Sequence, residues 1–135
     1  MLNEKLNIEK IISHWRETSD EDYYTMHAMF NSKSYHWALF LGHISLEKLL
    51  KAYYVKTKRK QAPPIHNLYR LAEVSDLDIT DKYSDWLDTI TQFNLHARYD
   101  DYKREFYHKC TKEYTTLWFE NIKELRGWIN QKLEK

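Results

Sequence analysis

Opposite charges stand four residues apart in a segment that is otherwise mostly apolar. Glu47 and Lys51 belong to the run SLEKLLKAYYV, whose other residues are largely Leu, Ala, Tyr and Val. In a helix the two side chains share a face, and a glutamate four residues before a lysine stabilises a helix surface. If the segment instead lies at the centre of a fold, both charges become costly and a functional site becomes the better interpretation. Both interpretations are open.

A histidine and an asparagine follow the proline pair of the chain. His66 and Asn67 come directly before a short apolar pattern and just after Pro63-Pro64, which stop the preceding helix. Asn67 fits a helix N-cap, with His66 bonded to a backbone carbonyl. The functional alternative is anion binding at the N-terminus of the new helix, with His66 as a ligand-binding residue.

Arg98 and Tyr99 end another helical pattern. Positive charge near a helix C-terminus is favourable without any function. The planar guanidinium of arginine also holds phosphates through its fork of donors, so these two residues are candidates for ligand binding. Asp100 and Asp101 follow directly and weaken phosphate affinity by repulsion, unless they engage Arg98 or a metal.

Asp22 lies on the apolar stripe of the first predicted helix. A carboxylate in that place is costly unless it is paired or hydrogen-bonded. We expect a structural pair with Arg98; a direct ligand-binding role and exposure at the edge of the fold are the alternatives. The chain has seven histidines, but no two have the i, i+4 spacing of a helical zinc site, so we expect no metal and no cofactor.

The composition favours an all-α fold. Glycine and proline number two each among 135 residues, whereas sheet proteins use both to turn between strands. Hydrophobic content is 42%, which gives enough apolar area for one folded core over residues 1–135. The single cysteine excludes an internal disulfide, and neither a signal segment nor a membrane-spanning stretch is evident. We therefore expect a single cytoplasmic domain without membrane contact.

The net charge of +1 gives the whole chain no strong preference for polyanions. The charges are unevenly distributed, since a basic cluster at residues 56–60 precedes an acidic section at residues 73–88. Two solvated surfaces are the simplest interpretation. A phosphate-facing edge and a complementary dimer contact are the alternatives.

Apolar residues recur every three or four positions over most of the chain, which predicts helices. Residues 34–58 are apolar on several sides, so this helix belongs in the middle of a bundle. A helix start at Ser19-Asp20 is an alternative to one continuous first helix, which we prefer. Residues 99–109 lack a clean period and are expected to be a loop or an extension of the fourth helix. The sequence thus predicts an antiparallel up-and-down helical bundle of four long helices, at about residues 7–31, 34–58, 80–98 (capped by Thr80 or Asp78) and 111–133, with one short helix at about residues 66–75.

The order of these landmarks resembles a HEPN domain over about residues 8–133. The resemblance rests on Trp15 and Asp22, the run SYHWALFLGHISLEKLLKAYYVK, the stretch PPIHNLYRL, the ARYDD that ends the fourth helix, and an aromatic-rich last helix. HEPN domains are helical bundles that commonly dimerise, and many are linked to nucleotides or RNA. Some work beside a minimal nucleotidyltransferase. Glu47 and Lys51 match a Glu-x-x-x-Lys feature of the family, and Arg98 matches its arginine at the end of helix four.

Some HEPN domains are metal-independent ribonucleases, as in toxin–antitoxin pairs, and these carry an arginine and a histidine separated by four to six residues. The arginine holds a phosphate and the histidine transfers protons near neutral pH. In this chain His108 follows Arg98 after nine residues and Arg104 after three, so neither spacing fits. The Arg-Tyr-Asp form resembles the branch without nuclease activity, and whether the chain is an enzyme stays open.

Taken together, the residues and the resemblance predict a HEPN-like homodimer with a shared polar groove. The groove is expected to be formed by Asp22, Glu47, Lys51, His66, Arg98 and Tyr99. Nucleotide or RNA binding is the expected function, with a minimal nucleotidyltransferase as the candidate partner. A metal-independent ribonuclease and a structural dimerisation module are the alternatives.

Overall fold

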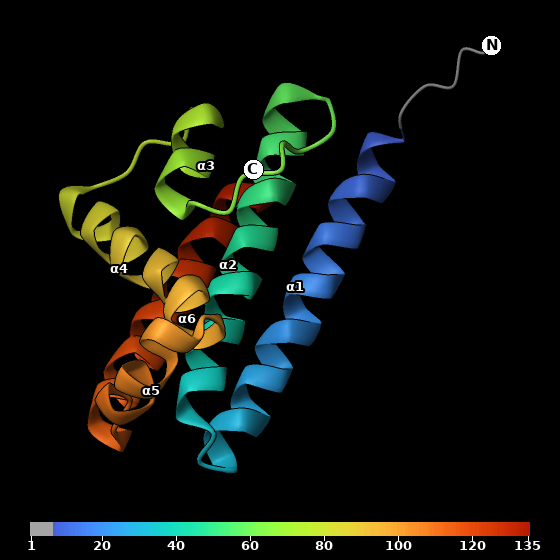
Figure 1. Cartoon of the computed structure of the whole chain (residues 1–135). Coiled ribbons are helices and arrows are strands. Elements are labelled where there is room, and N and C mark those ends of the chain that lie inside the picture. Colours follow the sequence, from blue (N-terminus) through green and yellow to red (C-terminus); the bar gives the residue numbers. More distant parts are fainter. Residues whose placement is uncertain (1–6) are drawn as a thin grey trace.

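Helices make up most of the computed structural model, which describes residues 7–135 (Figure 1). They are α1 (Ile8–Asn31), α2 (Tyr35–Lys58), α3 (Leu68–Val74), α4 (Asp81–Arg98), α5 (Asp100–Lys109) and α6 (Lys112–Glu134). No strand occurs among the described residues, and the predicted all-α class is confirmed. Residues 1–6 lie outside the described part of the chain. They belong to the predicted domain, and a signal segment would begin with them.

Side chains cap four of these helices at their N-termini. In each case a side-chain oxygen accepts a hydrogen bond from the backbone N–H three residues later, which satisfies a donor that the helix itself leaves free. The capping residues are Asn7 at α1, Asn67 at α3, Thr80 at α4 and Thr111 at α6. The Asn67 cap was predicted, and Thr80 rather than Asp78 caps α4. Helix α1 continues through Ser19-Asp20, as preferred from the sequence.

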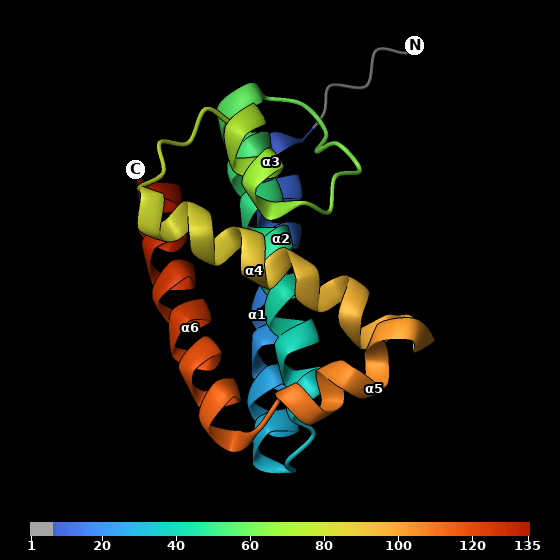
Figure 2. The ribbon, with the colours of Figure 1, turned by 60° about the vertical axis from the view of Figure 1, so that its left-hand side comes forward.

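Helix α2 lies at the centre of the bundle. It packs against each of the other five described helices, which surround it in Figure 1 and Figure 2. Thirteen of its 24 residues are buried, against two of the 24 in α1, so the predicted central position is confirmed. Gly42 lets α1 and α6 approach α2 closely, because an added Cβ would lie 3.0 Å from Met26 Sδ and closer still to Ile122.

The chain turns between α4 and α5. Tyr99 has an extended backbone (φ −95°, ψ 130°) and interrupts the helix at that residue. Helix α5 then runs across the N-terminal half of α2 (Figure 2), and Phe106 of α5 is buried with its ring 5.5 Å from that of Phe93 in α4. Residues 99–109 are therefore neither a loop nor a straight extension of α4. They form a separate helix after a break.

Two lysines of the basic cluster have partners within the chain. Lys58 pairs with Asp76 of the acidic section, and Lys56 Nζ donates to the Leu133 carbonyl oxygen, 2.6 Å away, at the end of α6. The basic and acidic sections are thus joined by an ion pair inside one copy of the protein. None of the described helices combines the length and apolar character needed to cross a membrane.

Candidate functional site

Glu47 is the centre of a polar cluster between α2 and the segment that leads into α3. Its Oε2 accepts a hydrogen bond from Lys51 Nζ at 3.0 Å, and its Oε1 lies 3.1 Å from His66 Nδ1. Glu47 and Lys51 are each 7% exposed, whereas the His66 side chain is 68% exposed. Each buried charge offsets part of the desolvation cost of the other. Three residues singled out from the sequence therefore meet in one place.

The Glu47 carboxylate fixes the orientation of the His66 ring. An ionised carboxylate only accepts hydrogen bonds, so Nδ1 of His66 donates to Glu47. In the neutral ring this leaves Nε2 as the atom that accepts a proton or a hydrogen bond. A carboxylate that orients an imidazole in this way prepares it for proton transfer or for ligand binding. The predicted bond from the His66 ring to a backbone carbonyl is wrong, because the ring bonds Glu47 instead.

His43 supports the same cluster from the interior. Its ring is fully buried, and Nε2 lies 2.9 Å from the backbone carbonyl oxygen of His66, to which it donates because a carbonyl only accepts. Burial lowers the pKa of His43 below 6.5, although this hydrogen bond and the charge of Glu47 oppose the shift. His43 is therefore neutral at pH 7. It holds the segment before α3 against α2.

Arg98 and Tyr99 lie on the surface at the C-terminal end of α4. The guanidinium carbon of Arg98 is 5.4 Å from the centre of the Tyr99 ring, which is a cation–π arrangement. Tyr99 is 51% exposed. The charge of Arg98 lowers the pKa of His43, so Arg98 lies within electrostatic reach of the Glu47 cluster. The positive charge of Arg98 therefore acts on His43, the residue that bonds the backbone of His66.

Asp22 lies in a different part of the bundle. Its Oδ2 is 2.7 Å from Lys48 Nζ, and its charge acts on Arg126. The predicted pair between Asp22 and Arg98 is wrong, because α2 lies between α1, which carries Asp22, and α4, which carries Arg98 (Figure 1). Helical periodicity placed Asp22 on an inward stripe but could not say which helix that stripe faces.

Sequence reasoning missed a buried arginine. Arg126 of α6 is 5% exposed, and its Nη1 donates to Ser19 Oγ and, over 2.8 Å, to Ser45 Oγ. Its Nη2 donates to Asp20 at 2.6 Å, and its guanidinium carbon lies 4.3 Å from the centre of the Tyr23 ring. One side chain therefore ties α6 to both α1 and α2. Burial lowers the pKa of Arg126, and the bond to Asp20 opposes that shift.

A family comparison places this site in context. The model of the HEPN domain matches residues 12–132, which is most of the chain. The chain belongs to the HEPN domain family. No curated protein and no solved structure gives a significant match. The predicted resemblance is thus confirmed, and membership of the HEPN family supports a function connected with nucleotides or RNA.

This HEPN domain keeps Arg98 and His108 apart within one chain. Helix α5 begins at Asp100, two residues after Arg98. Its rise of 1.5 Å per residue places His108 about 12 Å along the helix axis from Asp100. His108 instead lines a pocket with Arg104, one turn earlier, and with His36 at the start of α2. The sequence did not predict this pocket, because residues 99–109 showed no clean period.

The exposed groups of the HEPN site differ in role from the buried ones. His66, Arg98 and Tyr99 are exposed to solvent. Glu47 and Lys51 are buried, and Glu47 contacts His66 from below the surface. Among residues 7–135, no three His, Cys, Asp or Glu side chains gather closely enough to hold a metal ion. The arrangement can present a cation, an aromatic ring and an oriented imidazole.

Proposed function

We propose that this HEPN domain binds a nucleotide or RNA on the surface formed by His66, Arg98 and Tyr99. The observation that carries the proposal is the buried Glu47 carboxylate, which Lys51 neutralises and which holds an exposed imidazole. Two buried charges cost desolvation free energy that an apolar pair would avoid. Orienting an exposed histidine is a function that explains why these charges are buried.

Each exposed group suits a different part of a nucleotide. The planar guanidinium of Arg98 can bond two phosphate oxygens at once. The exposed Tyr99 ring can stack on a base, a contact that tolerates any sequence. His66 can exchange hydrogen bonds with a phosphate or a ribose hydroxyl. Glu47 and Lys51 act as positioning residues and do not touch the ligand. A ligand-binding role for Asp22 stays a prediction, separate from this surface.

Isothermal titration calorimetry with ATP and with a short single-stranded RNA tests the proposal. We expect binding that weakens as salt is added. Arg98→Ala should weaken binding more than Lys123→Ala, which removes an exposed charge on α6. Equal affinities for the two variants would remove Arg98 from the site. No binding of either ligand by the wild type would remove the function.

We also propose that two copies of the HEPN domain form a homodimer through the α4–α5 junction. Leu95 and Tyr102 at this junction are 41% and 44% exposed, and the junction projects from the bundle (Figure 2). Pairing two such junctions would cover these side chains and bring two Arg98 residues toward one groove. Light scattering at micromolar concentration should give about twice 16.6 kDa. A monomer that persists at high concentration contradicts the dimer.

A minimal nucleotidyltransferase is the partner that we propose, on the basis of family membership. We place binding ahead of RNA cleavage because the length of α5 separates Arg98 from His108. Labelled RNA incubated in chelator with the wild type, Arg98→Ala and His108→Ala separates the two functions. We expect no cleavage that changes with either substitution. Metal-independent cleavage that both substitutions abolish would make the domain a ribonuclease.

A further inference from the structure

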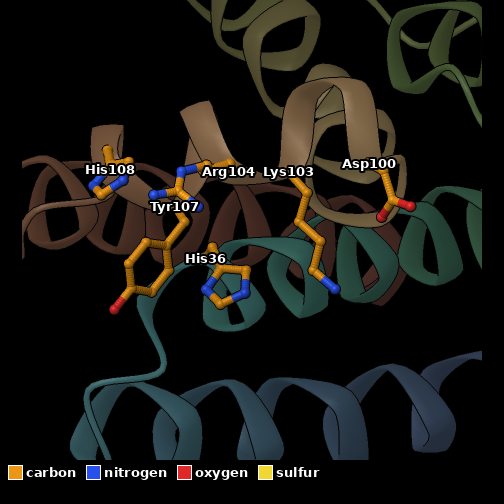
Figure 3. Close-up of a pocket in the computed structure, with 6 residues that line it drawn as sticks. All are labelled: His36, Asp100, Lys103, Arg104, Tyr107 and His108. Carbon is orange, nitrogen blue, oxygen red and sulfur yellow. The ribbon is translucent and has the colours of Figure 1, made fainter.

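A pocket that contains no residue of the Glu47 cluster lies between α5 and the first turn of α2 (Figure 3). Its volume is about 420 Å³, within the range of pockets that hold small ligands. It is lined by His36, Asp100, Lys103, Arg104, Tyr107 and His108. The last five belong to one face of α5, because their spacings follow the turn of a helix.

Aromatic contacts fix the position of the basic groups around this pocket. The Tyr107 ring meets the His36 ring edge-on, with 5.3 Å between their centres. Lys103 Nζ lies 5.1 Å from the centre of the Trp37 ring, a cation–π contact that holds the lysine against α2. Figure 3 shows Lys103 and Arg104 beside His36, with Asp100 at the opposite end from His108. The pocket is therefore basic along most of its length and acidic at one end.

The positive charge of the pocket is not neutralised by ion pairs. Among residues 7–135, neither Lys103 nor Arg104 pairs with a carboxylate. Lys33 lines an adjoining hollow that shares His36 and His108 with the pocket. Helix α2 begins beside them, and its N-cap Ser34 makes no capping hydrogen bond through its side chain. The positive end of the helix dipole therefore adds to the cationic side chains.

His36 adds an imidazole to the same wall of the pocket. Its Nδ1 is buried and has no hydrogen-bond partner. Burial lowers the pKa of His36, and the charge of Lys103 lowers it further, so the ring is neutral at pH 7. A buried N–H without a partner is rarer in proteins than an unpaired acceptor. Placing the proton on Nε2 avoids a buried N–H without a partner, and in this tautomer Nε2 is a donor.

We infer that this pocket binds a ribonucleotide, with the phosphate held by Lys103, Arg104 and His36 and the ribose hydroxyls at Asp100. Two unpaired cations and a neutral donor suit phosphate oxygens. A carboxylate repels an anion but accepts hydrogen bonds from hydroxyls, so Asp100 favours a ligand that carries both groups. The choice of a ribonucleotide rests on the proposed function, whereas the phosphate site rests on the pocket alone.

Calorimetric titration with AMP, adenosine and inorganic phosphate tests each part of the inference. We expect AMP to bind more tightly than inorganic phosphate, and adenosine to bind at least about tenfold more weakly than AMP, because it lacks the charge-assisted bonds of the phosphate. A short RNA with and without a 5′-phosphate then distinguishes a free nucleotide from an RNA end as the ligand. Absence of AMP binding overturns the inference. Equal affinity for AMP and inorganic phosphate overturns the ribonucleotide assignment.

Substitutions separate this pocket from the Glu47 site. Arg104→Gln should weaken AMP binding by about tenfold or more, Arg104→Lys should weaken it less, and Lys123→Gln on the exposed face of α6 should leave it unchanged. Asp100→Asn should weaken AMP but strengthen inorganic phosphate. If Arg98→Ala abolishes AMP binding and Arg104→Gln leaves it intact, the inference fails while the proposed function stands. If Arg104→Gln abolishes AMP binding and Arg98→Ala leaves it intact, AMP binds in this pocket and not at the Glu47 site.

A second measurement reports on the phosphate directly. Histidine resonances followed by NMR across pH give the pKa of His36, assigned through a His36→Gln variant. A bound phosphate offsets the repulsion from Lys103, with Asp100, Arg104 and His108 also facing the ring, so saturating AMP should raise the pKa of His36. An unchanged or lowered value at saturation contradicts the placement of the phosphate.

Discussion

Removing the buried Arg126 guanidinium should destabilise the bundle, and the size of the effect can be worked out from its contacts. Breaking a fully buried ion pair by deleting one partner costs about 3–5 kcal/mol, mostly because the other charge is stranded. The Asp20 side chain is 69% exposed, so it returns to water when Arg126 is removed. Ser19 keeps its bond to the Ser45 carbonyl oxygen. Truncating this buried side chain also leaves a cavity, and Ser45 Oγ loses its donor. We therefore expect Arg126→Ala to cost about 3 kcal/mol.

The charge and the packing of Arg126 can be separated with a second variant. Arg126→Met keeps most of the side-chain volume, and the exposed Asp20 is not left as a buried unpaired charge when the guanidinium is removed. We expect this variant to cost about 1 kcal/mol, since Ser45 Oγ loses a donor. Urea unfolding at pH 7 gives both values; with a slope near 2 kcal/mol per M, a cost of about 3 kcal/mol lowers the midpoint by about 1.5 M. An Arg126→Ala midpoint within about 0.3 M of the wild type, or equal losses in both variants, would refute the reasoning.

Three further predictions can be tested by unfolding experiments and by chemical labelling of the cysteine. Gly42→Ala should cost about 1–3 kcal/mol because its Cβ would press on Ile122 and Met26. Gly127→Ala meets nothing within 4 Å and should stabilise the protein by about 0.5–1 kcal/mol; equal effects of the two substitutions contradict the close packing at Gly42. The folded-state pKa of His43 lies below 6.5, so the unfolded chain takes up the proton first as pH falls, and stability should decline from pH 7 to pH 5. His43→Gln should reduce that decline, and an unchanged decline excludes His43 as its source. Burial raises the pKa of Cys110 to about 12, so iodoacetamide at pH 8 should modify the native protein much more slowly than the urea-unfolded one; equal rates contradict its burial.

The sequence predicted the pairing of Glu47 with Lys51 because a local pattern was sufficient there. Four-residue spacing placed Glu47 and Lys51 on one face, and the prolines and the Asn67 cap fixed where the next helix starts. The contact between Glu47 and His66 required one more step, since it depends on how the segment before α3 returns to α2. That path is a tertiary feature, and the predicted partner of His66 was accordingly wrong.

The pocket between α5 and the first turn of α2 could not be predicted because the break at Tyr99 has no local signal. Neither glycine nor proline stands there, and an extended backbone is open to any residue. Arg126 did leave a signal, because it follows Ile122 by four residues and precedes Ile129 by three, on the buried stripe of α6. A charged residue on such a stripe needs a polar partner. Only the packing of the bundle determines which residues become the partners of Arg126.

The salt dependence of RNA binding tests the central claim most directly. A fluorescent single-stranded RNA is titrated into the wild type, His66→Gln, Arg98→Ala and Lys123→Ala at several salt concentrations. If the RNA lies across His66 and Arg98, both variants at the site bind more weakly, and Arg98→Ala also reduces the slope of log affinity against log salt by about 1, because one phosphate contact is lost. Lys123→Ala keeps the wild-type affinity and slope. Wild-type affinity and slope in Arg98→Ala would contradict the account.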